Sequence, residues 1–320
     1  MDSKVLVAFF LFCIPAGFVT AQSGATARQE AREYFAASYA HLTELSDYDV
    51  SIRMERTMVV DGMVVPHSTG HWRLRLDKQK GFYLFASLDR RISATDAAEG
   101  RLDQWHVRGS VLIVQGGEAK THILGEGVGT DTYPSFEEAY DKINRPELGY
   151  VGTGEFTLVC LDPKSQKIRL SRVLSAADDV SVSTVNKGEG CLIRGIFKDW
   201  RAIESHSWQY STESLCPERY TIRVEPRLLG KTLVDFDQTL KWADHAKLGW
   251  VPVTIESSQP VRLNLKAKDG TAKYVPAERL DDVTLDWKPS ASYAPPAKLV
   301  KTSYTLMNVH DIVELEKGAQ

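Results

Sequence analysis

The eight histidines are the first side chains to test for chemistry, because an imidazole can hold a metal ion or transfer a proton near neutral pH. Only His67 and His71 lie close together in the sequence. Four residues of a strand span about 13 Å, whereas each nitrogen ligand of zinc lies about 2.1 Å from the metal. Unless the chain bends at Gly70, we expect no metal site. Both histidines are then expected on the solvent face of a strand, beside Arg73 and Arg75.

Two glycine-containing segments resemble nucleotide-binding motifs without completing them. Residues 125–129 read GEGVG, but Thr130 stands where GxGxxG needs its last glycine. Residues 230–232 match the end of a phosphate-binding loop, but Glu225 occupies the position of its first glycine. No GxSxG or HExxH string occurs. We therefore expect a protein without cofactor or metal and without enzymatic activity, and keep a hydrolase with a different kind of site as an alternative.

Acidic pairs offer little acid–base chemistry in this pattern. Asp178-Asp179 and Asp281-Asp282 are adjacent in the sequence, and adjacent strand residues point to opposite faces. Because two cooperating carboxylates must face one another, we expect these residues in turns instead.

Three arginines, Arg53, Arg73 and Arg75, fall on the polar face of two neighbouring predicted strands. As a basic stripe they would suit an anionic headgroup or a protein partner. The favoured interpretation is cross-strand pairing with nearby acidic residues, as is usual on the wet face of a sheet.

The elements that position these residues are mostly strands. Alternation of apolar and polar residues predicts them at 48–55, 71–77, 219–225, 261–266 and 283–287, and an apolar run covered on both faces at 82–88. Tight turns are predicted at Asp61-Gly62, Gly116-Gly117 and Asp269-Gly270. Strands joined in this way form an antiparallel sheet with one wet face.

Helices are predicted at two places. Residues 26–45 have the helical spacing of an amphipathic helix, through Ala31, Phe35, Tyr39 and Leu42. A short helix is expected at 135–144, ended by Pro146. The pattern leaves open whether the region 135–146 separates two sheets or interrupts one.

The composition and the N-terminal residues indicate the class of partner and the cellular location. The 39 basic and 42 acidic residues nearly balance, which argues against a nucleic-acid partner. Residues 1–21 combine a short apolar run with small residues before Gln22, as in a cleaved signal peptide. An uncleaved anchor is the alternative. We expect an exported protein, periplasmic or extracellular, with a sheet domain at 22–287 and a proline-containing linker and tail at 288–320.

Removal of residues 1–21 would leave three cysteines, Cys160, Cys191 and Cys216. Their spacing matches no CxxC motif, and an odd number cannot pair completely within one chain. One disulfide with one buried thiol, or three buried thiols, are both compatible with this pattern.

Two segments, GHWRLRLDKQKGFYLF at 70–85 and QWHVRGSVLIVQ at 104–115, resemble strands of the LolA/LolB-like lipoprotein-localisation carrier superfamily. The segment LGWVPVTIE at 248–256 resembles closing strands of exported relatives. The resemblance implies an α+β fold in which a large, curved antiparallel β-sheet, similar to half a barrel, is packed on the N-terminal amphipathic helix.

A curved sheet of this kind suits an apolar ligand, because each buried CH₂ group contributes about 0.8 kcal/mol. The predicted lining residues are Ile52, Met54, Trp72, Leu74 and Leu76. The expected ligand is a lipid acyl chain or a lipidated partner, and peripheral contact with a membrane is compatible with it. The alternatives are that these residues only pack the N-terminal helix, and that the protein is a closed-core scaffold or interaction module of the cell envelope.

Overall fold

The computed structural model describes residues 22–44, 47–92, 96, 105–123, 128–142, 174–185, 190–227, 233–266 and 272–289. In chain order its elements are β1 (Gln22–Ser23), α1 (Ala25–Glu44), β2 (Asp47–Val60), β3 (Met63–Asp77), β4 (Phe82–Ile92), β5 (Trp105–Gln115), β6 (Glu118–Ile123), β7 (Val128–Thr132), α3 (Phe136–Lys142), β8 (Asp179–Val185), β9 (Gly190–Lys198), β10 (Ala202–Ser211), β11 (Pro217–Pro226), β12 (Leu233–His245), β13 (Gly249–Lys266) and β14 (Ala272–Lys288).

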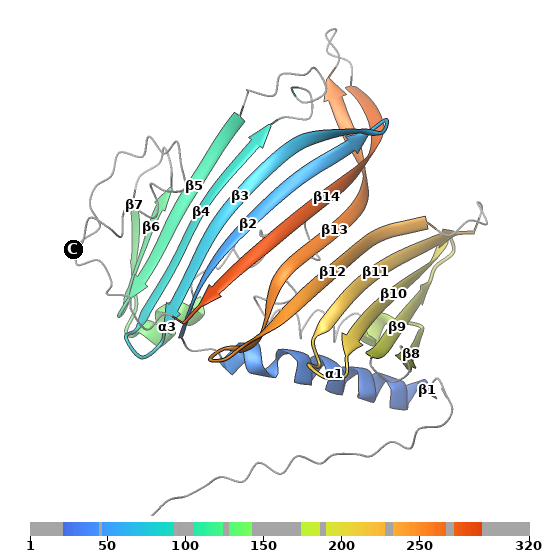
Figure 1. Cartoon of the computed structure of the whole chain (residues 1–320), viewed down its shortest axis with the longest axis horizontal. Helices are drawn as coiled ribbons and strands as arrows, with labels where there is room; N and C mark the ends of the chain where they lie inside the picture. Colours follow the sequence, from blue (N-terminus) through green and yellow to red (C-terminus); the bar gives the residue numbers. More distant parts are fainter. Residues whose placement is uncertain are drawn as a thin grey trace, which may run out of the picture.

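Within the described residues all strands belong to one antiparallel sheet, in the order β1-β8-β9-β10-β11-β12-β13-β14-β2-β3-β4-β5-β6-β7. Strand β14 pairs with β2 and so joins the C-terminal series of hairpins to the N-terminal one. Strands β7 and β8, which precede and follow α3 in the sequence, lie at opposite parts of this sheet, so the region 135–146 interrupts one sheet. Figure 1 shows an open, strongly curved surface with α1 below strands β8–β12, which confirms the predicted fold class.

Tight turns fix the register of the N-terminal hairpins. Asp61 and Gly62 both have positive φ (50° and 79°), as a two-residue turn between β2 and β3 requires. Gly116, with φ 54°, starts the turn between β5 and β6. Both turn predictions are confirmed, whereas Asp269-Gly270 lies outside the described residues.

Alternation of side chains places a large apolar cluster on the concave face of the sheet. It includes residues from β2 to β6, from β8 to β14 and from both helices, among them Ala27, Val50, Phe85, Phe136 and Trp287. Strand β4 also contributes Phe82, Leu84, Ala86 and Leu88 to a second buried cluster with β5. These two clusters confirm that β4 is apolar on both faces.

Helix α1 covers the C-terminal part of the sheet. Its main contacts are with β1, β8 and β13. The guanidinium of Arg28 donates to the carbonyl of Ala177 at 2.7 Å, and the rings of Tyr34 and Tyr210 lie 6.1 Å apart. The helix thus packs on the sheet as predicted, but mainly against strands far from β3.

Several predictions fall outside the described residues: the signal peptide at 1–21, Cys160, and the linker and tail beyond residue 289. In the part of the chain that the structure describes, no helix has the length and apolarity needed to cross a membrane.

Candidate functional site

The five predicted lining residues lie together on the concave face and are at most 6% exposed. Ile52 pairs with Trp72 across β2 and β3, and Leu74 and Leu76 follow along the same face of β3. Met54 lies opposite Val283 of β14. We call Ile52, Met54, Trp72, Leu74 and Leu76 the apolar strip.

A line of polar side chains crosses the concave face next to this strip. Each member pairs in register with the next, from β12 through β13, β14, β2 and β3 to β4: Gln238, Ser257, Asp281, Arg56, Ser68 and Arg91. We call these six residues the polar row. Arg56 lies two residues beyond Met54 on the same face of β2, so the strip leads directly into the row.

Asp281 is the centre of the polar row and is only 1% exposed. Its carboxylate accepts a hydrogen bond from Nε of Arg56 at 2.6 Å and lies 3.7 Å from Nε of Arg279. The hydroxyl of Ser257 donates to the same carboxylate at 3.5 Å. Burial raises the pKa of Asp281 against the opposing effect of these neighbours. Burial, together with the charges of Arg56 and Arg91, also lowers the pKa of Arg279.

Several buried polar atoms in the polar row, or next to it, lack hydrogen-bond partners among the described residues. Gln238 is 1% exposed, yet neither atom of its side-chain amide has a partner. Ser68 Oγ and His67 Nδ1 are also buried without a hydrogen-bond partner. A buried polar group without a partner costs about 1–3 kcal/mol. Among the described residues these atoms have no partner, so they can bond a water molecule or a polar ligand.

The predicted exposure of His67 is wrong. A β-bulge between Arg56 and Thr57 of β2 leaves His67 as the extra residue of β3, and its side chain is buried. Strict alternation from His71 would place His67 on the same convex face as His71. The bulge breaks this alternation, because an extra residue changes the face on which the neighbouring side chains lie. His71 itself is half-buried on the convex face.

We expect His67 to titrate near pH 4. Burial, with the charges of Arg91, Arg56 and Arg279, lowers its pKa from 6.5 to about 4. Because the folded protein disfavours the charged imidazole, this contribution to stability is complete above pH 6.5 and is lost as the pH falls toward 4. NMR titration of the imidazole should show the low midpoint. His67→Gln should reduce the pH dependence of the unfolding free energy in this range, and a midpoint near 6.5 would contradict the burial of this side chain.

Trp72 is the member of the apolar strip whose ring reaches toward the polar row. A Cβ atom added at Gly70 would lie 2.0 Å from Cη2 of Trp72, so the indole rests on the Gly70 backbone. Gly70 pairs with Met54 of β2, one pair away from the polar row along the same face. The glycine is thus needed for the close approach of the ring.

Sequence reasoning missed the polar row. Asp281 was expected in a turn, but it lies within β14, buried on the concave face, while Asp282 is exposed on the opposite face. The signal was present in β2: Arg56 continues the inward alternation of Ile52 and Met54. An arginine at an apolar-face position needs a buried partner, and its partner is 225 residues away in the sequence.

The pairing interpretation of the arginine stripe is confirmed for two of its three members. Arg73 donates to both carboxylate oxygens of Asp49, at 3.0 and 2.7 Å. Arg75 Nε donates to Oδ2 of the same carboxylate at 2.7 Å. Burial opposes ionisation of Asp49, but the two arginines outweigh it, and its pKa lies below the usual value. Arg53 is exposed.

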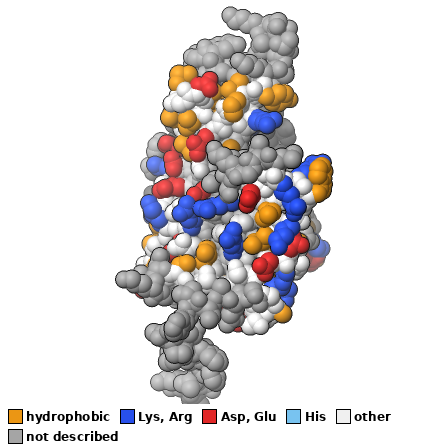
Figure 2. Space-filling view, turned by 90° about the vertical axis from the view of Figure 1, so that its right-hand side faces the viewer, with side chains coloured by type: hydrophobic (Ala, Val, Ile, Leu, Met, Phe, Trp, Pro, Cys, Tyr) orange, Lys and Arg blue, Asp and Glu red, His pale blue; other side chains and the backbone are white. Residues whose placement is uncertain are grey.

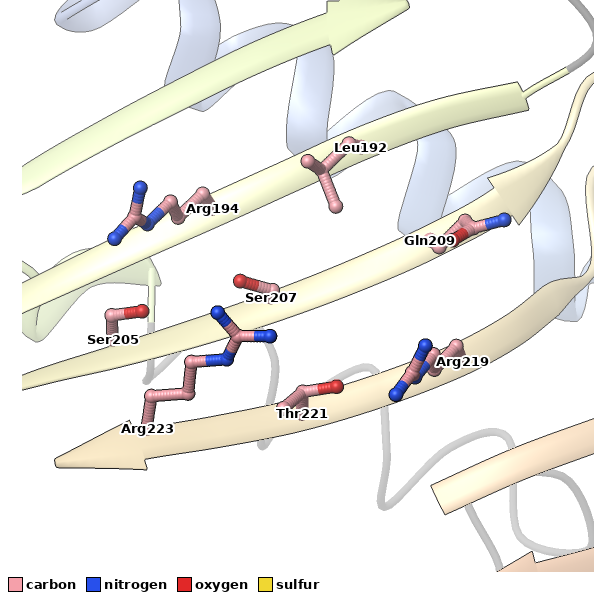
Figure 3. Close-up of a pocket in the computed structure, with 8 residues that line it drawn as sticks. All are labelled: Leu192, Arg194, Ser205, Ser207, Gln209, Arg219, Thr221 and Arg223. Atoms are coloured by element: carbon pink, nitrogen blue, oxygen red, sulfur yellow. The ribbon is translucent and has the colours of Figure 1, made fainter. Parts of the chain in front are cut away.

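A hollow of about 260 Å³ lies on the convex face of β9–β11. Figure 3 shows Arg223 reaching toward Ser207, whereas Arg194 points along β9 away from Ser207 and Arg219 lies beyond Thr221 on β11. Arg219 forms a bidentate pair with Asp237, at 2.9 and 2.5 Å. Figure 2 shows lysine and arginine side chains gathered across the middle of the viewed face. The hollow is open, and its arginines suit a surface anion.

The alternative of a hydrolase has one polar constellation to consider, on the concave face of β10 and β11. His206 Nδ1 lies 2.5 Å from the hydroxyl of Tyr220, and its Nε2 hydrogen-bonds Glu204. Trp208 stacks on Tyr220, with ring centroids 5.3 Å apart. Burial raises the pKa of Tyr220, so the phenol stays protonated and is a poor nucleophile.

Metal and thiol chemistry have little support in the described residues. No cluster of three potential metal ligands occurs among them. Cys191 and Cys216 are buried and unpaired, and burial raises the pKa of each thiol to about 11. Both are therefore protonated near neutral pH, as expected of structural thiols.

No family model and no curated protein matches the sequence. Among solved structures, the chain is similar to a DUF1329 family protein from Desulfovibrio piger, with 6% identity and a TM-score of 0.34, over 84% of this chain and 95% of that one. It is also similar to MucB in complex with MucA(peri), with 9% identity and a TM-score of 0.17, over 84% of this chain and 100% of that one. At these TM-scores the likenesses carry no argument about function.

Proposed function

We propose that this protein is an exported, non-enzymatic carrier that binds the apolar chain of a lipid or of a lipidated partner along the apolar strip. Membership of the lipoprotein-carrier superfamily is part of the proposal. The observation that carries it is the junction of the strip with the polar row. There, a continuous apolar surface ends in buried polar atoms that have no partner among the described residues.

The position of the helices supports the proposal. Helix α1 makes its main contacts with β1, β8 and β13, and α3 makes its main contacts with β5 and β6. In Figure 1 both helices lie toward one end of the strands, whereas β2, β3 and β14 extend well beyond them. The apolar strip on β2 and β3 is therefore not simply the packing surface of α1.

The chain length of the ligand gives a sharp test. Primary alcohols of increasing length, from octanol to tetradecanol, would be titrated into protein purified without detergent, and binding followed by calorimetry and native mass spectrometry. We expect one alcohol per protein, with the affinity rising about fourfold for each added CH₂, since each contributes about 0.8 kcal/mol. The rise should stop when the chain fills the strip.

Two methionines provide a matched pair of variants. Met54→Gln places an amide in the strip and should weaken binding of dodecanol about tenfold. Met63→Gln changes a residue that is 66% exposed at the tip of the β2–β3 hairpin and should leave binding unchanged. If no alcohol binds at any length, the proposal fails and the closed-core scaffold becomes the better interpretation.

The same mass measurement tests export. Protein expressed with its complete N-terminus in a secreting host should begin at Gln22. An intact Met1 would contradict the predicted cleavage.

A further inference from the structure

We propose that the hollow on the convex face of β9–β11 binds a phosphate group, carried either by a small soluble molecule or by the head of a phospholipid. This inference goes beyond the proposed function, because the hollow lies on the face of the sheet opposite the apolar strip. It gives the protein a second site, whose occupant is an oxyanion rather than an apolar chain.

Two arginines that line the hollow have no acidic residue directly across the neighbouring strands. Arg194 pairs in register with Ser181 and Ser207. Arg223 pairs with Ser205 on one side and with an apolar residue of β12 on the other. Within the described ranges neither guanidinium forms an ion pair or a hydrogen bond. Three acidic residues on these and the adjoining strands form no ion pair with either arginine in the described part of the chain: Asp179, Glu225 and Asp235.

The third arginine of the hollow already has a carboxylate. Arg219 donates to Asp237 at 2.9 and 2.5 Å, and Asp237 also accepts from Oγ1 of Thr221 at 3.3 Å. The eight residues that line the hollow include these three arginines and no acidic side chain. With Arg219 balanced by Asp237, the charges of the other two arginines remain to attract an anion.

The floor of the hollow supplies hydroxyl groups. Ser207 pairs directly with Thr221, and Ser205 is the next residue of β10 on the same face. Ser205 and Thr221 are only 6% and 7% exposed, whereas the three arginines are exposed, so the hydroxyls are recessed. The hydroxyls of Ser205 and Ser207 have no hydrogen-bond partner among the described residues, and each can donate one bond. In Figure 3 the guanidinium of Arg223 reaches toward Ser207.

This arrangement of donors fits a tetrahedral oxyanion. Guanidinium groups come from β9 and β11 and hydroxyl groups from β10 and β11, so that donors lie on different sides of the hollow. A phosphate group directs its oxygens to the corners of a tetrahedron, whereas the two oxygens of a carboxylate lie in one plane. Arginine matches phosphate through its planar fork of donors. Because the hollow is open and measures about 260 Å³, the phosphate can belong to a larger molecule.

The first experiment titrates the full chain with three soluble probes at pH 7: inorganic phosphate, glycerol 3-phosphate and acetate. Calorimetry measures the three affinities. We expect both phosphate compounds to bind at least about tenfold more tightly than acetate, because they accept charge-assisted hydrogen bonds on more sides.

Variants locate the bound phosphate. Arg194→Gln and Arg223→Gln should each weaken phosphate binding about tenfold, since each removes a charged donor at an exposed position. Ser207→Ala should weaken it about threefold, because a neutral donor is lost from the floor while the charge is unchanged. Arg53→Gln and Ser51→Ala are the matched controls. Both residues are exposed on the convex face of β2, away from the hollow, and both changes should leave the affinity unaltered.

Vesicles of phosphatidylglycerol distinguish the two sources of the phosphate group. If the ligand is a lipid head, the vesicles should bind the protein in a sedimentation assay, Arg223→Gln should weaken this binding about tenfold, and glycerol 3-phosphate should compete with it. If the vesicles do not bind while the soluble phosphate compounds do, the ligand is a soluble phosphate compound.

Three outcomes would overturn the inference. The first is absence of binding by inorganic phosphate, glycerol 3-phosphate and the vesicles alike. The second is binding that Arg194→Gln, Arg223→Gln and Ser207→Ala leave unchanged, which would place the anion elsewhere on the protein. The third is binding of acetate as tight as that of phosphate. The titration with alcohols tests the apolar strip separately, so failure of either proposal leaves the other standing.

Discussion

Replacing Asp281 by asparagine is expected to lower the free energy of unfolding by about 3–5 kcal/mol at pH 7. The change preserves the size of the side chain but removes the carboxylate that accepts from Arg56 at 2.6 Å and lies 3.7 Å from Arg279. Both guanidinium groups are mostly buried and would lose this counter-charge. Breaking a buried ion pair from one side is costly because the remaining charge stays away from water.

Asp282 supplies a matched control in the next position of the same strand. It is exposed on the convex face, so Asp282→Asn should change stability by less than about 0.5 kcal/mol. Urea unfolding of both variants, followed by far-UV circular dichroism, makes the comparison. A loss below about 1 kcal/mol for Asp281→Asn would show that the two arginines have another counter-charge.

Trp72→Ala should also lower the unfolding free energy by about 3–5 kcal/mol, since large-to-small changes of buried aromatic residues leave a cavity. Trp72 is 4% exposed, and its indole is held against the Gly70 backbone. The same change removes the side chain that lies at the junction of strip and row. Unfolding in urea measures the loss, and under the proposed function dodecanol binding should weaken as well.

An exposed tryptophan provides the comparison. Trp200 is 77% exposed and lies beside Arg201, whose guanidinium is 4.3 Å from the ring centroid. Trp200→Ala should lower the free energy of unfolding by less than about 1 kcal/mol, because only a solvent-exposed cation–π contact is lost. If the two variants lost stability equally, the assignment of Trp72 to the core of the concave face would be wrong.

The sequence by itself determined the local structure of most strands. Alternation in β2 and β3 placed Ile52, Trp72 and Leu74 on one face, because side chains of an extended chain alternate with a period of two. Asp61-Gly62 marked its turn because two positive φ angles require residues that tolerate them. Helix α1 followed from its spacing of apolar residues. These features depend on residues that are close together in the chain, so the sequence is sufficient to predict them.

The polar row was decided only by the tertiary structure. Asp281 and Arg56 are 225 residues apart, and their pairing depends on the register between β14 and β2, which closes the two halves into one sheet. The burial of His67 depends on a bulge that has no clear mark in the sequence. Which strand meets which is set by the combined packing of the whole concave face. A single position therefore cannot reveal that its charge will be buried, or which distant residue will balance it.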